Sequence, residues 1–164
     1  MELKEYIKDI NDYPIQGVTF RDIQPLLAER NAFNYAIRNM LFSCGRIPDY
    51  FIGVESRGFM FAGAMAMQAG CGFKMIRKAG KLPPGNTKTL EYELEYGSAA
   101  IELEELPANS HKTAVVVDDV YATGGTMEAA RKLALSCGYA LFESICLIDI
   151  GLTEPKNTKC LISY

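Results

Sequence analysis

The chain has 164 residues, a formal net charge of −3 and an apolar content of 49%. This length fits one ordinary domain with a real core. The acidic balance argues against a protein that coats nucleic acid, which would show a basic excess. The longest apolar run, GFMFAGAMAM, is shorter than the roughly 20 residues of a membrane span, and the five cysteines form no CxxC pair. We therefore expect a cytoplasmic protein that binds neither nucleic acid nor membrane.

The first half of the chain predicts helices alternating with strands. MELKEYIKDI has the spacing of a short amphipathic helix, which Pro14 and Gly17 would end. NAFNYAIRNMLFSCG also carries apolar residues at helical spacing and stops at Gly45. DYFIGVE then predicts a buried strand, GFMFAGAMAMQAG a helix packed closely on a sheet, and GFKMIRK a second strand.

Residues 89–106 follow a different pattern from the rest of the chain. TLEYELEY alternates strictly between apolar and acidic residues, which predicts a strand with one wet face, and the alternation breaks at Gly97 and Ser98. We expect an antiparallel hairpin outside the parallel sheet. The preceding loop, KLPPGNTK, is rich in proline and lysine, as mobile functional loops often are.

The second half of the chain returns to strands and helices. TAVVVDD predicts a third strand, whose continuous apolar run is typical of a strand covered on both faces. TMEAARKLALSCG predicts a helix that ends at Gly138, and ALFESICLIDI and KCLISY predict two more strands. This alternation predicts an α/β fold, a mostly parallel twisted sheet flanked by helices, with the antiparallel hairpin added to it.

A doubled negative charge ends the third predicted strand. Ligands of open α/β sheets bind at the carboxyl ends of strands, which is where Asp118 and Asp119 are expected. Gly124 and Gly125 then open a helix, whose N-terminal N–H groups and dipole favour a phosphate. Two carboxylates beside a phosphate suit the vicinal hydroxyls of a ribose. An aspartate-rich turn with a glycine-rich cap would also give this pattern.

Several motifs together resemble one protein family. VVVDDVYATGGT resembles the ribose-5-phosphate loop of the type I phosphoribosyltransferases. Four further motifs resemble, in order and spacing, those of the adenine-using members: YPIQGVTFRDIQPLL (13–27), GVESRGFMFAGAMA (53–66), IRKAGKLP (76–83) and YELEYG (92–97). The resemblance implies the type I phosphoribosyltransferase fold in a single domain, residues 1–164. About 1–30 would form a base-binding hood and about 31–164 the core, with a flexible loop and hairpin at 79–106.

The resemblance also implies a reaction. The chain would transfer the 5-phosphoribosyl group of PRPP to adenine, giving AMP and pyrophosphate, as a homodimer. Mg²⁺ would be the cofactor, held mainly by PRPP and water rather than by direct protein ligands. Two alternatives stay open: a phosphoribosyltransferase for xanthine, hypoxanthine or guanine, and a PRPP-sensing regulator on the same fold.

The site residues are carried over from the family motif by motif. The 5′-phosphate would bind Ala122, Thr123, Gly124, Gly125 and Thr126, and the ribose would bind Asp118 and Asp119. Pyrophosphate would bind Ser56, Arg57, Arg77, Lys81 and Tyr96, with Arg77 reaching the neighbouring subunit's site. Adenine would bind Thr19, Phe20, Arg21 and Val120, with Glu95 as the catalytic acid or base at N7.

Some of these roles have plain structural alternatives. Alternation alone does not separate Glu95 from Glu93, and Phe20 would also suit the core. The basic residues between positions 74 and 81 would also form a solvated face that pairs with the acidic hairpin. Where adenine enzymes commonly have DDLLATGG, this chain has DDVYATGG, so Val120 covers less of a base and Tyr121 adds a hydroxyl.

Overall fold

The computed structural model describes residues 1–94 and 97–164 of the chain, which fall into two units, Met1–Asn39 and Met40–Tyr164. The first unit holds a 3-10 turn, a two-stranded sheet and two helices, of which the second continues into the next unit. Their bounds are η1 Leu3–Tyr6, β1 Lys8–Asn11, β2 Thr19–Asp22, α1 Gln24–Ala28 and α2 Arg30–Ser43.

The helix predicted for MELKEYIKDI is wrong. Only η1 is helical, and β1 pairs with β2 in an antiparallel ladder that sets Lys8 opposite Asp22 and Ile10 opposite Phe20. The reason is that the backbone groups of Lys8–Asn11 are satisfied by Thr19–Asp22, a strand on the other side of the turn at Pro14 and Gly17. A local apolar spacing does not report such a partner.

The second unit is built on a mixed sheet. Within the described residues, seven strands form this sheet in the order β5-β6-β4-β3-β7-β8-β9, and β4, β3, β7, β8 and β9 are parallel. The predicted α/β fold, with a mostly parallel sheet flanked by helices, is confirmed. The elements are β3 Tyr50–Val54, α3 Gly58–Ala69, β4 Gly72–Lys78, β5 Thr87–Leu94, β6 Gly97–Glu104, β7 Lys112–Tyr121, α4 Gly125–Ser136, β8 Tyr139–Asp149 and β9 Lys159–Ser163.

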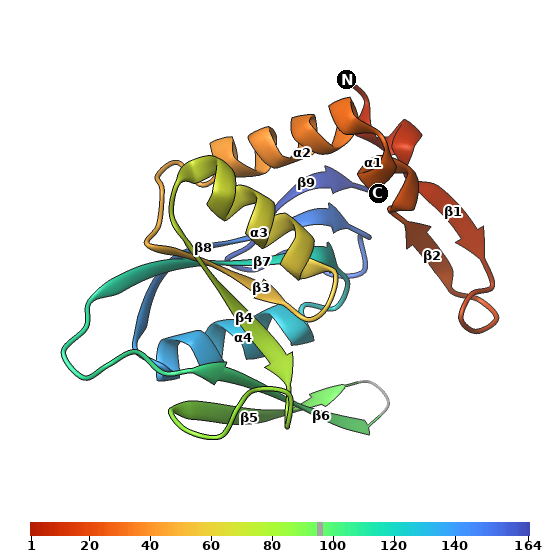
Figure 1. Ribbon diagram of the computed structural model, residues 1–164. Coiled ribbons are helices and arrows are strands. Elements are labelled where there is room, and N and C mark those ends of the chain that lie inside the picture. The colour runs from red at the N-terminus through yellow and green to blue at the C-terminus, as the bar shows by residue number, and fades with distance from the viewer. Residues whose placement is uncertain (95–96) are drawn as a thin grey trace. The chain divides into compact units, whose positions relative to one another are not determined.

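The strand order reverses direction between β3 and β7. The chain runs from β3 through α3 to β4 on one side, and from β7 through α4 to β8 on the other. Because such crossovers are right-handed, the two helices cover opposite faces of the sheet, and Figure 1 shows α3 on the near face and α4 on the far face. Within the described residues, no helix has the length and apolar character needed to cross a membrane.

The hairpin predicted for residues 89–106 is present, but its predicted place is wrong. β5 and β6 pair along their length, and β6 continues the sheet by pairing antiparallel with β4, Arg77 opposite Glu102 and Lys78 opposite Ile101. The free edge of β4 presents unpaired backbone groups, and Ile101 and Leu103 are buried. Pairing and burial together draw the hairpin into the sheet.

β7 is the middle one of the five parallel strands and extends beyond its apolar run. Val115, Val116 and Val117 are fully buried, as expected for a strand covered on both faces. The strand continues to Tyr121, so Asp118 and Asp119 lie within its last four residues rather than after its end. The two acids are therefore held by a hydrogen-bonded strand.

Asp49 ties the start of β3 to the start of β7. Its carboxylate accepts hydrogen bonds from the backbone N–H of Thr113 (2.8 Å), the hydroxyl of Thr113 (2.9 Å) and Nζ of Lys112 (3.0 Å). These bonds, that from the Thr113 N–H above all, lower the pKa of Asp49 to about 2.

We predict that Asp49→Asn lowers the thermal unfolding midpoint at neutral pH and that the difference closes in acid. A carboxyl with a lowered pKa stabilises the fold above its unfolded value, near 4, and loses this effect as pH falls towards 2. Thermal melts of both proteins between pH 2 and 7 measure the gap, with Glu91→Gln on the exposed surface of β5 as control. A gap that stays constant with pH would contradict this.

Candidate functional site

Two strand-to-helix junctions lie side by side at one edge of the sheet. β3 and β7 are adjacent and parallel, with Gly53 opposite Val117. The segments that leave them, 55–58 towards α3 and 122–125 towards α4, therefore emerge at the same edge. In open α/β sheets this reversal point is where ligands bind.

The junctions approach each other closely because residue 58 has no side chain. A Cβ built on Gly58 would lie 2.7 Å from the carbonyl oxygen of Val117 and 3.0 Å from Oδ1 of Asp118. These distances are too short for any larger residue unless β7 moves. Gly58 thus allows the ESRG segment to rest on the aspartate pair.

An ion pair joins the two junctions. Nε of Arg57 lies 2.7 Å from Oδ2 of Asp119, whose side chain is nearly buried. The peptide bond between Glu55 and Ser56, just before this arginine, is cis. The structure thus brings together the predicted pyrophosphate residues Ser56 and Arg57 and the predicted ribose residues Asp118 and Asp119.

The two aspartates are electrostatically strained. Burial raises the pKa of Asp118 well above its usual value, and the neighbouring charge of Asp119 raises it further. Burial also raises the pKa of Asp119, and the positive charge of the Arg57 guanidinium offsets part of this rise. The backbone N–H of Asp119 donates to Oδ1 of Asp118 at 2.9 Å and favours its ionised form in part. A ligand that donates hydrogen bonds to these carboxylates would relieve the strain.

The loop between β7 and α4 encloses a small niche. Gly124, with φ of +86°, turns the chain into α4, whose first residue is Gly125. The niche has a volume of about 80 Å³ and is lined by Asp118, Val120 and residues 121–127. Backbone N–H groups at a helix start lack intrahelical acceptors. The five loop residues predicted for the 5′-phosphate, 122–126, all line this niche.

Arg77, one of the predicted cations, is held by an acid of the same unit. Nε of Arg77 donates to Oε2 of Glu55 (3.1 Å), and the N–H of Lys78 donates to the same oxygen (2.8 Å). The hydrogen bond from the Lys78 N–H lowers the pKa of Glu55 most, and Arg77 lowers it further. Lys74 pairs with Glu104 of the hairpin, so the solvated-face interpretation holds for that lysine.

Glu102 is a residue that sequence reasoning missed. It is 6% exposed, and its carboxylate accepts hydrogen bonds from the backbone N–H groups of Gly80 (3.0 Å), Lys81 (2.7 Å) and Leu82. These bonds, that from Leu82 first, lower its pKa. In the alternating pattern Glu102 reads as one more solvent-facing acid, so no sequence signal singled it out. It fixes the base of the loop that carries Lys81.

Three of the four predicted base-binding residues lie on β2 in the first unit, whereas Val120 lies on β7 in the second. Thr19 donates to Asn11 through its hydroxyl, the ring of Phe20 packs edge-on against Tyr13 with centroids 5.3 Å apart, and Arg21 pairs with Asp9. Glu95 and Tyr96, predicted for catalysis and pyrophosphate binding, lie outside the described residues.

The site offers few donor groups for a metal ion. Among residues 1–94 and 97–164 no cluster of three or more His, Cys, Asp or Glu side chains could hold a metal ion. The oxygen donors at the junction are the two aspartates, one of which is engaged by Arg57. This set suits a hard cation that arrives with substrate phosphates and keeps most of its water.

The fold and this site define a phosphoribosyltransferase. A model of the phosphoribosyl transferase domain matches residues 22–163. An adenine phosphoribosyltransferase of Bdellovibrio bacteriovorus is 46% identical over 151 residues, which cover 92% of this chain and 88% of the relative. The chain belongs to the adenine phosphoribosyltransferase family.

Solved structures agree with this assignment. The adenine phosphoribosyltransferase of Thermoanaerobacter pseudethanolicus superposes with a TM-score of 0.91 at 36% identity, over 99% of this chain and 98% of that one. The enzyme of Saccharomyces cerevisiae gives a TM-score of 0.87 at 31% identity, over 98% and 96%. That yeast structure holds adenine and an imino-altritol bisphosphate.

We predict that Asp118→Asn raises the thermal unfolding midpoint at pH 7. A carboxyl whose pKa is raised in the folded protein destabilises the fold once ionised, so the free energy of unfolding falls as pH rises from about 4 through that raised pKa. The asparagine variant lacks this fall, so its advantage should shrink towards pH 4. Calorimetry of both proteins from pH 4 to 8 checks this, and a lower midpoint for the variant at pH 7 would disprove it.

Proposed function

We propose that this chain transfers the 5-phosphoribosyl group of PRPP to adenine and releases AMP and pyrophosphate. The observation that carries the proposal is the niche of about 80 Å³ between Asp118 and the start of α4. This small niche borders the first turn of α4 and suits a compact anionic group such as a phosphate. The helix start favours an anion in that niche.

The aspartate pair would hold the ribose. Vicinal 2′ and 3′ hydroxyls donate hydrogen bonds to carboxylates, and Asp118 and Asp119 follow one another directly before the phosphate loop. As the bond from C1′ to pyrophosphate breaks, positive charge builds on the sugar. Two carboxylates fixed in a strand stabilise that charge without having to reorganise.

Pyrophosphate would occupy the neighbouring space. A second cavity, of about 370 Å³, lies between the β3 and β4 ends, the hairpin and Thr126, and includes Glu55, Lys78 and Tyr92 in its wall. We assign pyrophosphate to the residues carried over from the family: Ser56, Arg57, Arg77, Lys81 and Tyr96. Of these, Arg77 donates to Glu55, which lines this cavity. Arg57 would then exchange its contact with Asp119 for one with the leaving group, which frees that carboxylate for the ribose.

Mg²⁺ would be held by PRPP oxygens and water, with Asp118 or Asp119 nearby as oxygen donors. When bound, it neutralises charge that develops on pyrophosphate as that group leaves. The protein's own groups would position the substrate: the loop would bind the 5′-phosphate, the aspartates the ribose, and the cations the leaving pyrophosphate.

Adenine would stack on Phe20, with Thr19 and Arg21 offering backbone groups to its edge and Val120 beside it. An aromatic ring contributes roughly 1–3 kcal/mol when a base stacks on it. Glu95 would take or give the proton at N7 while the new bond forms from the base to C1′. Holding base and ribose in line supplies the remaining acceleration.

The direct test is AMP formation from PRPP and Mg²⁺ with adenine, hypoxanthine, guanine and xanthine in parallel. We expect turnover with adenine alone, and a drop in kcat of about 100-fold or more in Glu95→Gln. Glu93→Gln, two residues earlier on the exposed face of β5, is the matched control and should keep the wild-type rate.

Other outcomes of this test separate the alternatives. Faster turnover of an oxopurine would leave the PRPP site standing and overturn the assignments of Phe20 and Glu95. PRPP binding without turnover of any base would favour a PRPP-sensing regulator. Loss of activity in Glu93→Gln rather than Glu95→Gln would move the catalytic role by two residues.

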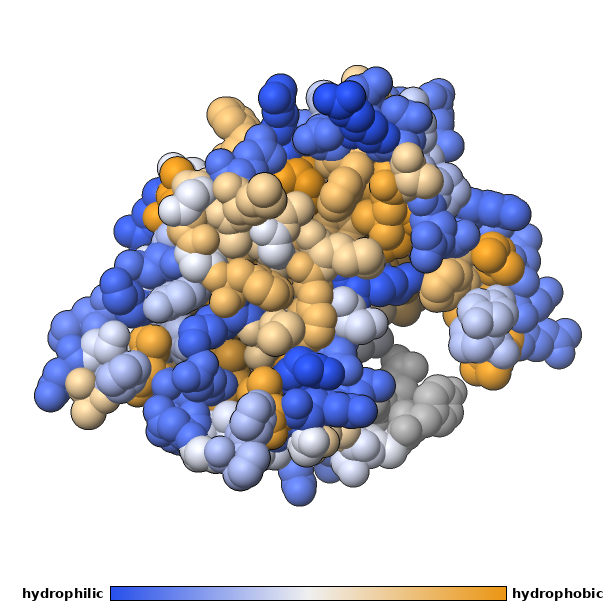
Figure 2. Space-filling model, viewed as in Figure 1, coloured by the Kyte–Doolittle hydropathy of each residue, from blue (hydrophilic) through white to orange (hydrophobic). Residues whose placement is uncertain are grey.

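We also propose that the chain forms a homodimer through the outer face of α3 and β4. Met60, Met67, Phe73 and Met75 expose large apolar surface there, and Met67 is 88% exposed. Figure 2 shows apolar atoms gathered over α3 on the face towards the viewer. The guanidinium of Arg77 lies 5.9 Å from the ring of Phe59, at the margin of this patch. An interface here would bring Arg77 towards the neighbouring subunit's site.

We predict that Met67→Lys shifts the protein from dimer to monomer, because a charge at the centre of an apolar interface must be desolvated. Sedimentation velocity at micromolar concentration measures this. Leu135→Lys, at an exposed apolar residue of α4, is the control and should stay dimeric. A dimer that persists in Met67→Lys would place the interface elsewhere.

A further inference from the structure

The segment that follows β8, residues 150–157, braces the phosphate loop. The backbone N–H of Ile150 donates to the carbonyl oxygen of Tyr121 (3.1 Å). The hydroxyl of Thr153 donates to the carbonyl oxygen of Ala122 (3.2 Å). The N–H of Lys156 donates to the phenolic oxygen of Tyr121 (3.2 Å). We call residues 150–157 the brace segment.

The far end of the brace segment is fixed to α4. Nη1 of Arg131, a residue of α4, donates to the carbonyl oxygen of Asn157 (3.3 Å) and to the hydroxyl of Ser144, which is buried in β8. The helix that begins at the phosphate loop therefore also holds the segment that supports this loop. The loop, α4 and the brace segment are thus connected to one another in a closed ring of contacts.

Tyr121 is the central contact between the loop and the brace segment. Its side chain is 5% exposed, and its phenol lies directly against the loop: a Cβ built on Gly124 would be 2.3 Å from its oxygen and 2.8 Å from Cζ. Gly124 is the residue whose left-handed conformation turns the chain into α4. The tyrosine ring thus supports the loop at its point of sharpest turning.

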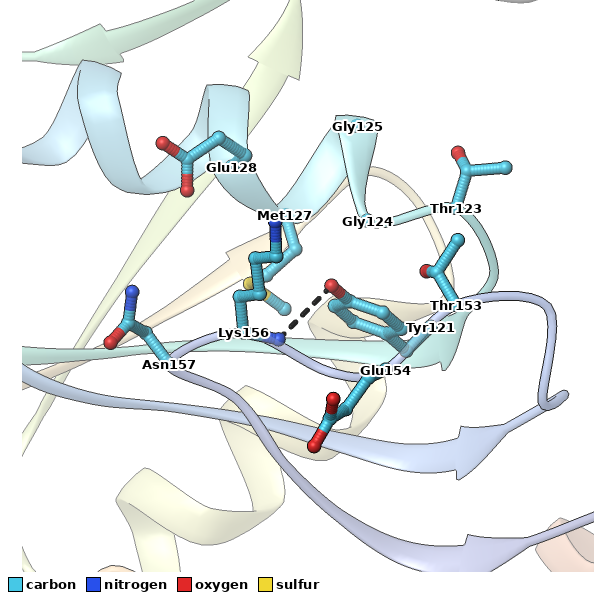
Figure 3. Close-up of a pocket in the computed structure, with 10 residues that line it drawn as sticks. All are labelled: Tyr121, Thr123, Gly124, Gly125, Met127, Glu128, Thr153, Glu154, Lys156 and Asn157. Carbon is cyan, nitrogen blue, oxygen red and sulfur yellow. Dashed lines mark hydrogen bonds between the residues drawn. The ribbon is translucent and has the colours of Figure 1, made fainter.

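Close packing does not replace this support. Beside the loop lies a cavity of about 480 Å³ (Figure 3), in which the Tyr121 hydroxyl stands between Gly124 and the backbone of Lys156. On this side the loop borders open space rather than a layer of core side chains. A gap in packing forfeits the contacts that would hold a segment in place. The tyrosine and the hydrogen bonds of the brace segment are therefore what define the loop's position here.

We propose that Tyr121 is a positioning residue for PRPP, which acts by holding the phosphate loop in the conformation that receives the 5′-phosphate. The inference deepens the proposed function and rests on it. Tyr121 acts through Gly124 and Ala122, whose backbone positions it sets. Losing its hydroxyl leaves the ring but releases Lys156, so the loop samples conformations in which its N–H groups no longer converge on one anion.

The test is Tyr121→Phe in the full chain, with PRPP varied at saturating adenine and adenine varied at saturating PRPP. We expect the KM for PRPP to rise about three- to tenfold, the effect of losing one hydrogen bond of ordinary strength. The KM for adenine should stay unchanged and kcat within about twofold. Binding of ribose 5-phosphate, which needs only the loop and the aspartates, should weaken by the same factor.

Two further variants separate positioning from general stability. Tyr139→Phe also removes a buried tyrosine hydroxyl, which donates to the carbonyl oxygen of Glu104 (3.2 Å) at the other end of the same core, and both KM values should stay at wild-type level. Thr153→Val removes the bond to Ala122 from an exposed position and should raise the KM for PRPP in the same way. This second variant keeps the test valid if Tyr121→Phe folds poorly.

The outcomes for the inference and for the proposed function are distinct. An active wild type with unchanged KM for PRPP in Tyr121→Phe and Thr153→Val overturns the inference alone. Equal losses for PRPP and adenine, accompanied by a lower unfolding midpoint, would also overturn it, because they indicate a purely structural role. A wild type that neither binds nor turns over PRPP overturns both.

Discussion

The structure depends on how closely two strand-to-helix junctions approach each other. Gly58 lets the segment after β3 rest on the backbone of β7. A Cβ at this position would lie only 2.7 Å from the carbonyl oxygen of Val117. That approach brings Arg57 to Asp119 and places both beside the phosphate loop. The cationic and the anionic halves of the site come from segments about sixty residues apart, and the pairing of β3 with β7 brings them together.

The same arrangement stores electrostatic strain in the core. Two consecutive carboxylates lie at the buried end of β7, where burial raises the pKa of both. Arg57 offsets part of the strain in the free protein, and ribose hydroxyls would offset it in the complex. The fully buried valines of β7 and the apolar face of α4 supply the stability that such a pair removes. The fold thus tolerates a site that is poorly satisfied until its ligand arrives.

Sequence patterns predicted what depends on neighbours along the chain and missed what depends on partners far from it. The apolar run before Asp118 and the glycines after it correctly predicted β7, the loop that follows it and α4. The hydrogen bonds that make Lys8–Asn11 a strand, and those that attach the hairpin to β4, come from partner strands elsewhere in the chain. Glu102 was missed for the same reason, since its partners at 80–82 follow the neighbouring strand β4, about twenty residues earlier in the chain.

The two adjacent glycines of the phosphate loop differ in what they tolerate. Gly124 is constrained twice, by a φ of +86° and by the tyrosine ring that fills the space of a side chain. Gly125 has no such backbone restriction, and the nearest atom to its hypothetical Cβ is 3.8 Å away. Any residue but proline supplies the N–H that Gly125 offers. The contacts within the protein therefore leave space for a side chain at residue 125, whereas residue 124 changes only together with residue 121 and the backbone turn itself.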